Sequence, residues 1–596
     1  MPTNVKGVAV DPTEWNRNDG FSPGQPITVF VPGLDLQATG AAPVTDIGES
    51  LERDAPIVVL DTTTGKRHPY WAELDVSATR DGETDPALYV RPAVNYREGH
   101  HYVVALRHLK GHDGRTMPPT AAFRAYRDHL DTGNPALEQR RPAMEKVLKR
   151  LARAGVHRRD LYLAWDFTVA SERNLSERVL RMRDDAMHGL GRTRSPHFTV
   201  TPADQVTDQS RNGGRVVEGT FEVPLYLTKG GASGSRLAYG PDGLPQRTGT
   251  YTANFDCVLP TVAAPGGKPA RALVYGHGLL GSRDEVLGFG RYADNYNSVL
   301  CATDWIGLAE DDVANAAAIL QDLSNMPTLP DRVQQSFVNF QYLARLLKSP
   351  DGFASDPAFQ TADGRPVFAT GDVAYWGRSQ GGIFGGGATA MSTEWTRAVL
   401  GEAAANYSTL LTRSVDFDDY SPVAKSSYPN FDDRPMLQNL IQMLWDRGES
   451  NGYAAHVAHD PLPGTPKHKV LIFEAFGDHQ VANVATEVMA RTIGVKLRTP
   501  ALAPGRSPDR KPFWRLPRIH EYPYRGSALL MWDFGTPRPP TDNVPPRGPA
   551  FGDDPHDMDH GTPEALDAVT RYLAPDGSLG IICGGDPCNA KPIFDD

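Results

Sequence analysis

From about residue 216 onward, short apolar runs typical of strands alternate with segments of helical periodicity. The expected strands are Val216–Leu227, Thr250–Leu259, Ala272–Tyr275, Val299–Thr303, Val373–Trp376, Ala398–Glu402, Lys469–Phe473 and Leu529–Trp532. Strands that alternate with helices after an antiparallel start predict a mostly parallel sheet covered by helices on both faces. Residues 216–596 are therefore expected to form an α/β domain.

The first part of the chain has a different pattern, in which short strands are separated by turns. The expected strands are Ile27–Val31, Ile57–Leu60, Ala87–Val90 and Tyr102–Leu106. Strands at this spacing predict a β-rich, sandwich-like domain over residues 1–215, with a helical segment at about 136–190. The polar stretch Ser195–Arg215 is expected to link this domain to the rest of the chain.

One segment, residues 408–466, interrupts the alternation of strands and helices. It is rich in apolar and aromatic side chains, and these include Tyr420, Tyr428, Phe431, Leu437, Leu440, Ile441, Leu444 and Trp445. Two interpretations stay open. The segment is either a cap inserted over the C-terminal edge of the sheet or an ordinary helical excursion.

The charge balance is acidic, with 72 Asp and Glu against 61 Lys and Arg among 596 residues. A nucleic-acid partner would need a basic face, and the basic cluster Lys146–Arg159 fits the solvated side of a helix instead. No stretch reaches the ~18–20 apolar residues of a membrane span. The first residues lack the features of a secretory signal, so the chain is expected either to be cytosolic or to have had a signal removed. The oligomeric state leaves no signature in the sequence.

The four cysteines are too few for a disulfide scaffold, but their placement favours two disulfides over free buried thiols. Cys583 and Cys588 lie in a tight loop rich in glycine and proline, and Cys257 and Cys301 each lie in an expected strand. No histidine pair accompanies them at the spacing of a zinc site. Two disulfides would imply an oxidising, extracytoplasmic compartment.

The strongest chemical signal is Ser379, which lies in a G-x-S-x-G motif, Gly377–Gly381. An apolar strand precedes the motif and small residues follow it, so a strand–turn–helix is expected, with the serine hydroxyl at a helix N-terminus. This context predicts a nucleophile rather than a buried turn serine. A second match, Gly448–Gly452, has no strand before it and is expected to be a polar loop.

A serine that transfers an acyl group needs an oxyanion hole, which usually consists of two backbone N–H groups. We expect one from Gln380, directly after the nucleophile. The other is expected from Leu279, where the strand Ala272–Tyr275 runs into His277-Gly278. The alternative for this second segment is an ordinary glycine turn.

The serine also needs an acid and a base, in the chain order Ser, Asp, His. Asp478 lies in the loop after the strand Lys469–Phe473 and is the predicted acid, with Asp533 as the alternative. We expect the adjacent His479 to point elsewhere.

Two histidines compete for the role of the base, His556 and His560. Thr562 and Pro563 are expected to start a helix after them. Enzymes that carry these three groups in the order Ser, Asp, His commonly have the catalytic histidine about seven residues before such a helix start. This spacing favours His556. His560, three residues before it, stays open as the alternative.

Together these motifs resemble those of the α/β-hydrolase superfamily of serine esterases and lipases. The matching segments are His277-Gly278, Gly377–Gly381, Asp478 and His556. More narrowly, the chain is similar to large bacterial secreted lipases and esterases with an N-terminal β-rich, Ig-like domain and a C-terminal cysteine pair. Arg378 and Gln380 flank the serine, unlike in common lipases, which argues against a triglyceride lipase.

This resemblance implies a carboxylic-ester hydrolase that forms an acyl-enzyme on Ser379 and needs no metal or organic cofactor. The apolar residues of 408–466 suggest a hydrophobic ester. Two other functions stay open. One is a serine peptidase or amidase of the prolyl-oligopeptidase type, although the sequence shows no propeller repeat. The other is a binding or adhesion protein with a vestigial hydrolase domain.

Overall fold

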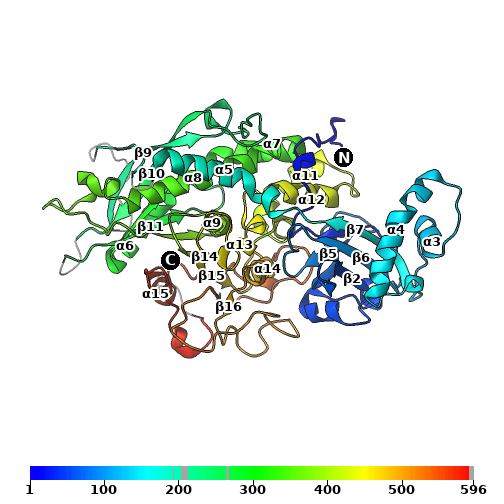
Figure 1. Cartoon of the computed structure of the whole chain (residues 1–596). Coiled ribbons are helices and arrows are strands. Elements are labelled where there is room, and N and C mark those ends of the chain that lie inside the picture. Colours follow the sequence, from blue (N-terminus) through cyan, green and yellow to red (C-terminus); the bar gives the residue numbers. More distant parts are fainter. Residues whose placement is uncertain (192–193, 203–212, 263–266, 590–596) are drawn as a thin grey trace.

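The structure, a computed structural model, describes residues 1–191, 194–202, 213–262 and 267–589. Within these residues the largest element is a ten-stranded sheet with the order β16-β17-β15-β14-β13-β11-β12-β10-β9-β8 (Figure 1). Its strands are β8 (Phe198–Val200), β9 (Arg215–Leu225), β10 (Gly249–Leu259), β11 (Arg271–Gly276), β12 (Ser298–Ala302), β13 (Ala374–Arg378), β14 (Arg397–Gly401), β15 (Lys469–Ala475), β16 (Lys496–Leu497) and β17 (Ala528–Trp532). Strands β8, β9, β10 and β12 pair antiparallel, and all pairs from β12 to β16 are parallel.

Both faces of the parallel strands are buried under helices. Because successive side chains of a strand point to opposite faces, Tyr375 and Trp376 lie in two different core clusters. The larger cluster includes side chains of α8 (Thr328–Lys348), α9 (Gln380–Ala390) and α14 (Asn483–Ile493), and the other includes those of α6 (Gly290–Tyr296) and α15 (Pro563–Tyr572). This is an α/β-hydrolase-like fold, so the predicted fold class is confirmed.

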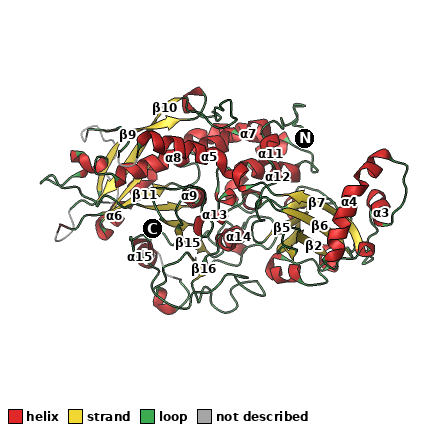
Figure 2. Ribbon diagram, in the orientation of Figure 1, coloured by secondary structure: helices red, strands yellow, loops and turns green. Residues whose placement is uncertain are grey.

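The first part of the chain forms two small antiparallel sheets, with the orders β1-β5-β4 and β3-β2-β6-β7. The strands are β1 (Ile27–Val29), β2 (Ile57–Asp61), β3 (Lys66–Arg67), β4 (Tyr70–Leu74), β5 (Leu88–Pro92), β6 (His101–Arg107) and β7 (Leu161–Thr168). Figure 2 shows them gathered at one end of the molecule and the large sheet at the other. The β-rich character predicted for this part is therefore present.

The helices before residue 190 pack in two different places. The helix α4 (Pro135–Arg153) covers the small sheet, where Val147 and Leu151 share a core cluster with strands β2, β6 and β7. The helix α5 (Glu172–Leu190) contacts α8 instead, and its side chains Val179 and Met182 belong to the core of the large sheet. Part of the expected linker forms strand β8, and residues 203–212 of it lie outside the described residues.

Both expected disulfides are present in the structure. Cys257 on β10 and Cys301 on β12 face each other in the antiparallel register, with a Cα–Cα distance of 4.1 Å. The second pair, Cys583 and Cys588, closes a loop beside β17, where the Cys588 carbonyl accepts a hydrogen bond from Asp533 N. Over the described ranges, we find no helix with the length and apolar character needed to cross a membrane.

Candidate active site

Ser379 lies at the sharp turn between β13 and α9, with φ 54° and ψ −123°. A positive φ is uncommon for a residue with a side chain, and it marks a strained turn that exposes the serine. Glycines on both sides make this turn possible. A Cβ on Gly377 would lie 2.4 Å from the oxygen of Gly381, and one on Gly381 would lie 2.1 Å from the oxygen of Gly276. Close packing of helix on strand therefore requires the motif predicted around Ser379.

The second G-x-S-x-G match has a structural role. Ser450 begins a short 3₁₀ helix, Ser450–Gly452, and its side chain is 1% exposed. The segment expected to be a polar loop is therefore buried and partly helical. Its hydroxyl donates to the carbonyl of Ile383 on α9. A Cβ on Gly386 would lie 2.1 Å from Ser450 Oγ, so this serine fills the space that a glycine of α9 leaves open.

The segment predicted to supply an oxyanion donor lies beside Ser379. A Cβ on Gly278 would lie 4.0 Å from the Cβ of Ser379, and Gly278 N is held by Glu285 Oε2 at 2.7 Å. The N–H of the next residue, Leu279, has no acceptor among the described residues. The N–H of Gln380 belongs to the first turn of α9, where backbone donors have no intrahelical partner. Both donors are thus available to a ligand.

The structure brings His556 and Asp478 together. His556 Nδ1 lies 2.9 Å and 3.0 Å from the two carboxylate oxygens of Asp478, and each residue is 3% exposed. The carboxylate is fixed in turn, because Asp478 Oδ1 accepts hydrogen bonds from Gln480 N and Val481 N at 2.8 Å. His556 Nε2 is buried and has no hydrogen-bond partner among the described residues. The ring can therefore exchange a proton at Nε2 while Asp478 holds Nδ1.

The Asp478 carboxylate also changes the acidity of the imidazole. Burial lowers the pKa of His556, but the charge and the hydrogen bond of Asp478 outweigh it, so the pKa rises to about 9. A negative partner at hydrogen-bond distance stabilises the imidazolium.

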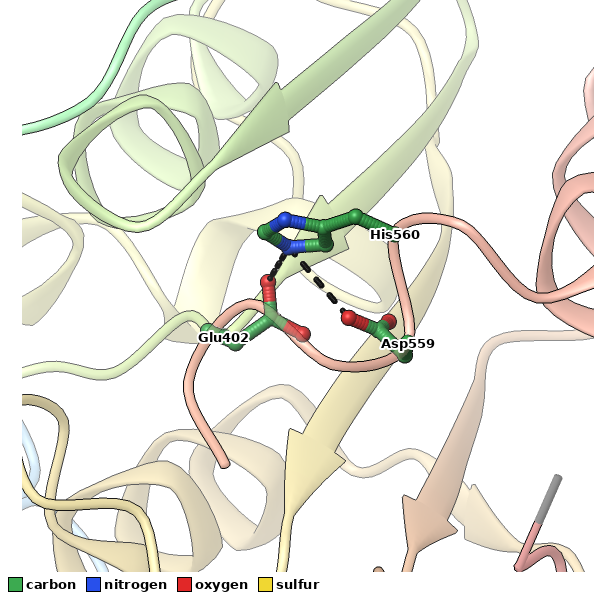
Figure 3. Close-up of side chains that lie close together, drawn as sticks. All are labelled: Glu402, Asp559 and His560. Atoms are coloured by element: carbon green, nitrogen blue, oxygen red, sulfur yellow. Dashed lines mark hydrogen bonds and ion pairs between the residues drawn. The ribbon is translucent and has the colours of Figure 1, made fainter. Parts of the chain in front are cut away.

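His560 has a different carboxylate partner. Its Nε2 lies 2.8 Å from Glu402 Oε2, and Glu402 directly follows β14 (Figure 3). Glu402 was not among the predicted candidate residues, although a carboxylate at the C-terminal end of the strand next to β13 is a signal that the sequence contains. Of the two histidines left open by the sequence, the one bonded to Asp478 is His556.

Asp533 and His479 are engaged elsewhere. Both oxygens of Asp533 bind the guanidinium of Arg506, at 2.5 Å and 2.7 Å. His479 Nε2 lies 3.3 Å from the carbonyl of Phe551. Asp533 contacts no histidine among the described residues, in contrast to Asp478.

Ser379 opens into a largely apolar pocket. Together with Gln380 and Leu279 it lines a space of about 970 Å³, which includes the open solvent at its mouth. Much of the wall comes from the segment between β14 and β15, which carries α10 (Tyr407–Leu410), α11 (Ser421–Ser427), α12 (Arg434–Trp445) and α13 (Ala455–Ala458). Its lining residues are Tyr407, Leu410, Leu411, Ser414, Asp416, Phe417, Tyr420, Ile441 and Trp445.

No protein-family model and no curated protein matches the sequence. Among solved structures, acetyl xylan esterase 1 from a Thermoanaerobacterium species is 13% identical with a TM-score of 0.33, covering 53% of this chain and 83% of that one. An acylaminoacyl peptidase from Pyrococcus horikoshii is 12% identical with a TM-score of 0.27, covering 46% and 41%. Prolyl oligopeptidase B from Galerina marginata is 12% identical with a TM-score of 0.29, covering 63% and 44%. The likeness to these esterases and peptidases concerns the fold alone.

Proposed function

We propose that the protein is a serine carboxylic-ester hydrolase. The observation that carries the proposal is the His556–Asp478 pair, in which a carboxylate holds Nδ1 and leaves Nε2 without a partner among the described residues. Ser379 supports it, because this serine occupies a strained turn at the wall of an apolar pocket. These are the three groups that a serine hydrolase needs, in the chain order Ser, Asp, His.

In the proposed reaction His556 Nε2 takes the proton of Ser379 Oγ while Oγ attacks the ester carbonyl carbon. The N–H groups of Leu279 and Gln380 stabilise the negative carbonyl oxygen. The imidazolium then protonates the leaving alcohol as the ester C–O bond breaks, and Asp478 stabilises the positive charge. Water repeats the sequence on the acyl-enzyme and releases the acid. As written, the reaction uses no metal or organic cofactor.

For the substrate we propose an ester with an apolar acyl chain, held under a cap formed by residues 408–466. The support is the pocket wall, where Leu410, Leu411, Phe417 and Trp445 of this segment lie in the same lining as Ser379. Burial of each additional methylene there would contribute about 0.8 kcal/mol. That residues 1–215 form a separate domain, and that Arg378 and Gln380 argue against triglyceride hydrolysis, stay predictions.

Filling the pocket is expected to shift chain-length preference. Ala316 on α7 (Val313–Gln321) lines the pocket, so the substitution Ala316→Trp should exclude long acyl chains. We expect the ratio of kcat/KM for p-nitrophenyl octanoate over acetate to fall about tenfold, since about 1.4 kcal/mol of lost binding is a factor of ten. Ala318→Trp, at an exposed position of the same helix, is the matched control. Equal effects of the two variants would contradict a chain site at this wall.

The pH profile offers an independent check. His556 must be neutral to accept the serine proton, and its pKa in the folded protein is about 9. The neutral form is therefore lost as the pH falls below this value, so kcat/KM should rise about tenfold per pH unit up to a plateau above about pH 9. A plateau reached already near pH 7.5 would place the base at its ordinary pKa and contradict the upward shift of the His556 pKa.

Two assays separate the proposal from its alternatives. A serine peptidase would cleave aminoacyl anilides faster than p-nitrophenyl esters, and a binding protein with a vestigial hydrolase domain would not react with a fluorophosphonate probe. We expect ester cleavage and labelling of Ser379. The two disulfides support an extracytoplasmic location, because such bonds persist in oxidising compartments.

A further inference from the structure

A second cluster of titratable side chains lies close to the proposed catalytic pair and takes no part in the mechanism above (Figure 3). Glu402 follows β14, and Asp559 and His560 lie in the loop after His556. His560 Nε2 lies 2.8 Å from Glu402 Oε2 and 3.3 Å from Asp559 Oδ1. Glu402 and Asp559 are each 1% exposed, so water does little to stabilise their charges.

Two carboxylate oxygens of this cluster have no donor. Figure 3 shows the second oxygen of Glu402 turned towards Asp559. Neither Glu402 Oε1 nor Asp559 Oδ1 has a hydrogen-bond partner in the described part of the chain. Buried carboxylate oxygens in this position need a proton or a cation between them.

The formal charges around the cluster are compatible with a divalent cation. Asp557 Oδ1 lies 3.2 Å from His560 Nδ1 and 3.4 Å from Arg378 Nη2. With His560 neutral, the three carboxylates of Glu402, Asp557 and Asp559 and the one guanidinium, that of Arg378, carry a net charge of minus two. A divalent ion would neutralise this charge.

We propose that Glu402, Asp559 and His560 form a binding site for a divalent transition-metal ion, with zinc as the first candidate. Their ligand atoms lie within 4.8 Å of one another, and two atoms bound to one ion at about 2.0–2.2 Å lie at most about 4.4 Å apart, so small side-chain movements would close the site on an ion. An imidazole nitrogen beside carboxylates favours zinc over calcium or magnesium, which prefer oxygen ligands. Metal-binding histidines usually have a carboxylate beside the ring nitrogen that does not bind the ion. Asp557 lies in that place, beside His560 Nδ1.

Such an ion would connect two parts of the chain that flank the proposed active site. Glu402 follows β14, which pairs with β13, the strand that ends beside Ser379. Asp559 and His560 come three and four residues after His556. A bound ion would therefore fix the loop of His556 to the edge of the sheet. The role is structural, and zinc binding can be tested whether or not the protein hydrolyses esters.

The experiment measures zinc in the full chain after purification and dialysis against a chelator. Calorimetric titration with zinc chloride should give one tight site per chain, and the melting temperature should rise with zinc because the ion binds the folded state. Glu402→Gln and Asp559→Asn should each weaken binding by about 100-fold or more. Asp557→Asn changes a side chain that is 75% exposed, so it should leave folding intact and weaken binding about tenfold.

The control is another histidine–carboxylate pair, His456 and Glu98, whose side chains lie 3.1 Å apart with the histidine buried. Glu98→Gln should keep zinc binding at the wild-type level. The proposal is overturned by a wild-type chain that binds no stoichiometric zinc, or by zinc binding that Glu402→Gln, Asp559→Asn and Asp557→Asn leave unchanged. Binding of calcium in place of zinc would overturn it as well, because the site would then not use the imidazole.

Discussion

Replacing Ser379 with alanine should abolish hydrolysis of p-nitrophenyl esters, with kcat lower by about 10⁴- to 10⁶-fold. The variant loses the atom that attacks the carbonyl carbon, and the residual rate comes from binding and the oxyanion donors alone. The fold should persist, because the Ser379 side chain makes no capping hydrogen bond to α9. The measurements are initial rates, fluorophosphonate labelling and the melting temperature.

The matched control is the other serine in a G-x-S-x-G motif. Ser450→Ala removes a buried hydrogen bond to Ile383 and should lower the free energy of unfolding by about 1 kcal/mol, with fluorophosphonate labelling retained. A Ser379→Ala protein with wild-type activity would contradict the proposed nucleophile. So would labelling that is lost in Ser450→Ala while the protein stays folded.

Replacing His556 with alanine should lower kcat by a similar factor, at least about 10⁴-fold, because no other group described in the structure combines a bond to Asp478 with a partnerless Nε2. Asp478→Asn should cost about 10⁴-fold, since the amide favours the wrong imidazole tautomer. His479→Ala is the control and should keep most of the activity, because its Nε2 lies against the Phe551 carbonyl. The measurement is kcat of the three variants on one p-nitrophenyl ester.

His560→Ala decides between the two histidines that the sequence left open. In the structure His560 pairs with Glu402, so its loss should cost far less kcat than the loss of His556. Full activity in His556→Ala combined with loss in His560→Ala would reverse the assignment of the base.

The fold class could be predicted because its signals are local. The strands of the large sheet are short apolar runs such as β12 and β14, buried along their whole length, and buried runs bounded by turns are legible in a sequence. The turn at Ser379 could also be predicted, because Gly377 and Gly381 are required by contacts with their own strand and helix and with Gly276. Strands β8 and β16 escaped prediction because three and two residues carry no periodicity.

Other features depend on contacts between distant segments. The expected strands near the N-terminus fall into two separate sheets, and α5 packs against α8 across more than 130 residues of chain, an arrangement that periodicity alone does not encode. Glu402 went unnoticed for the same reason, because its partner His560 lies 158 residues away.

The sequence by itself determined the alternation of strands and helices, the glycine-bounded turn at Ser379 and the cysteine positions, because each follows from short-range backbone and burial preferences. Only the tertiary structure decided which carboxylate each histidine meets, with Asp478 on His556 and Glu402 on His560. Both carboxylates come from neighbouring strands whose C-terminal ends lie at one edge of the sheet. The pairing is set by packing among side chains that lie far apart in the sequence, so the sequence alone does not determine it.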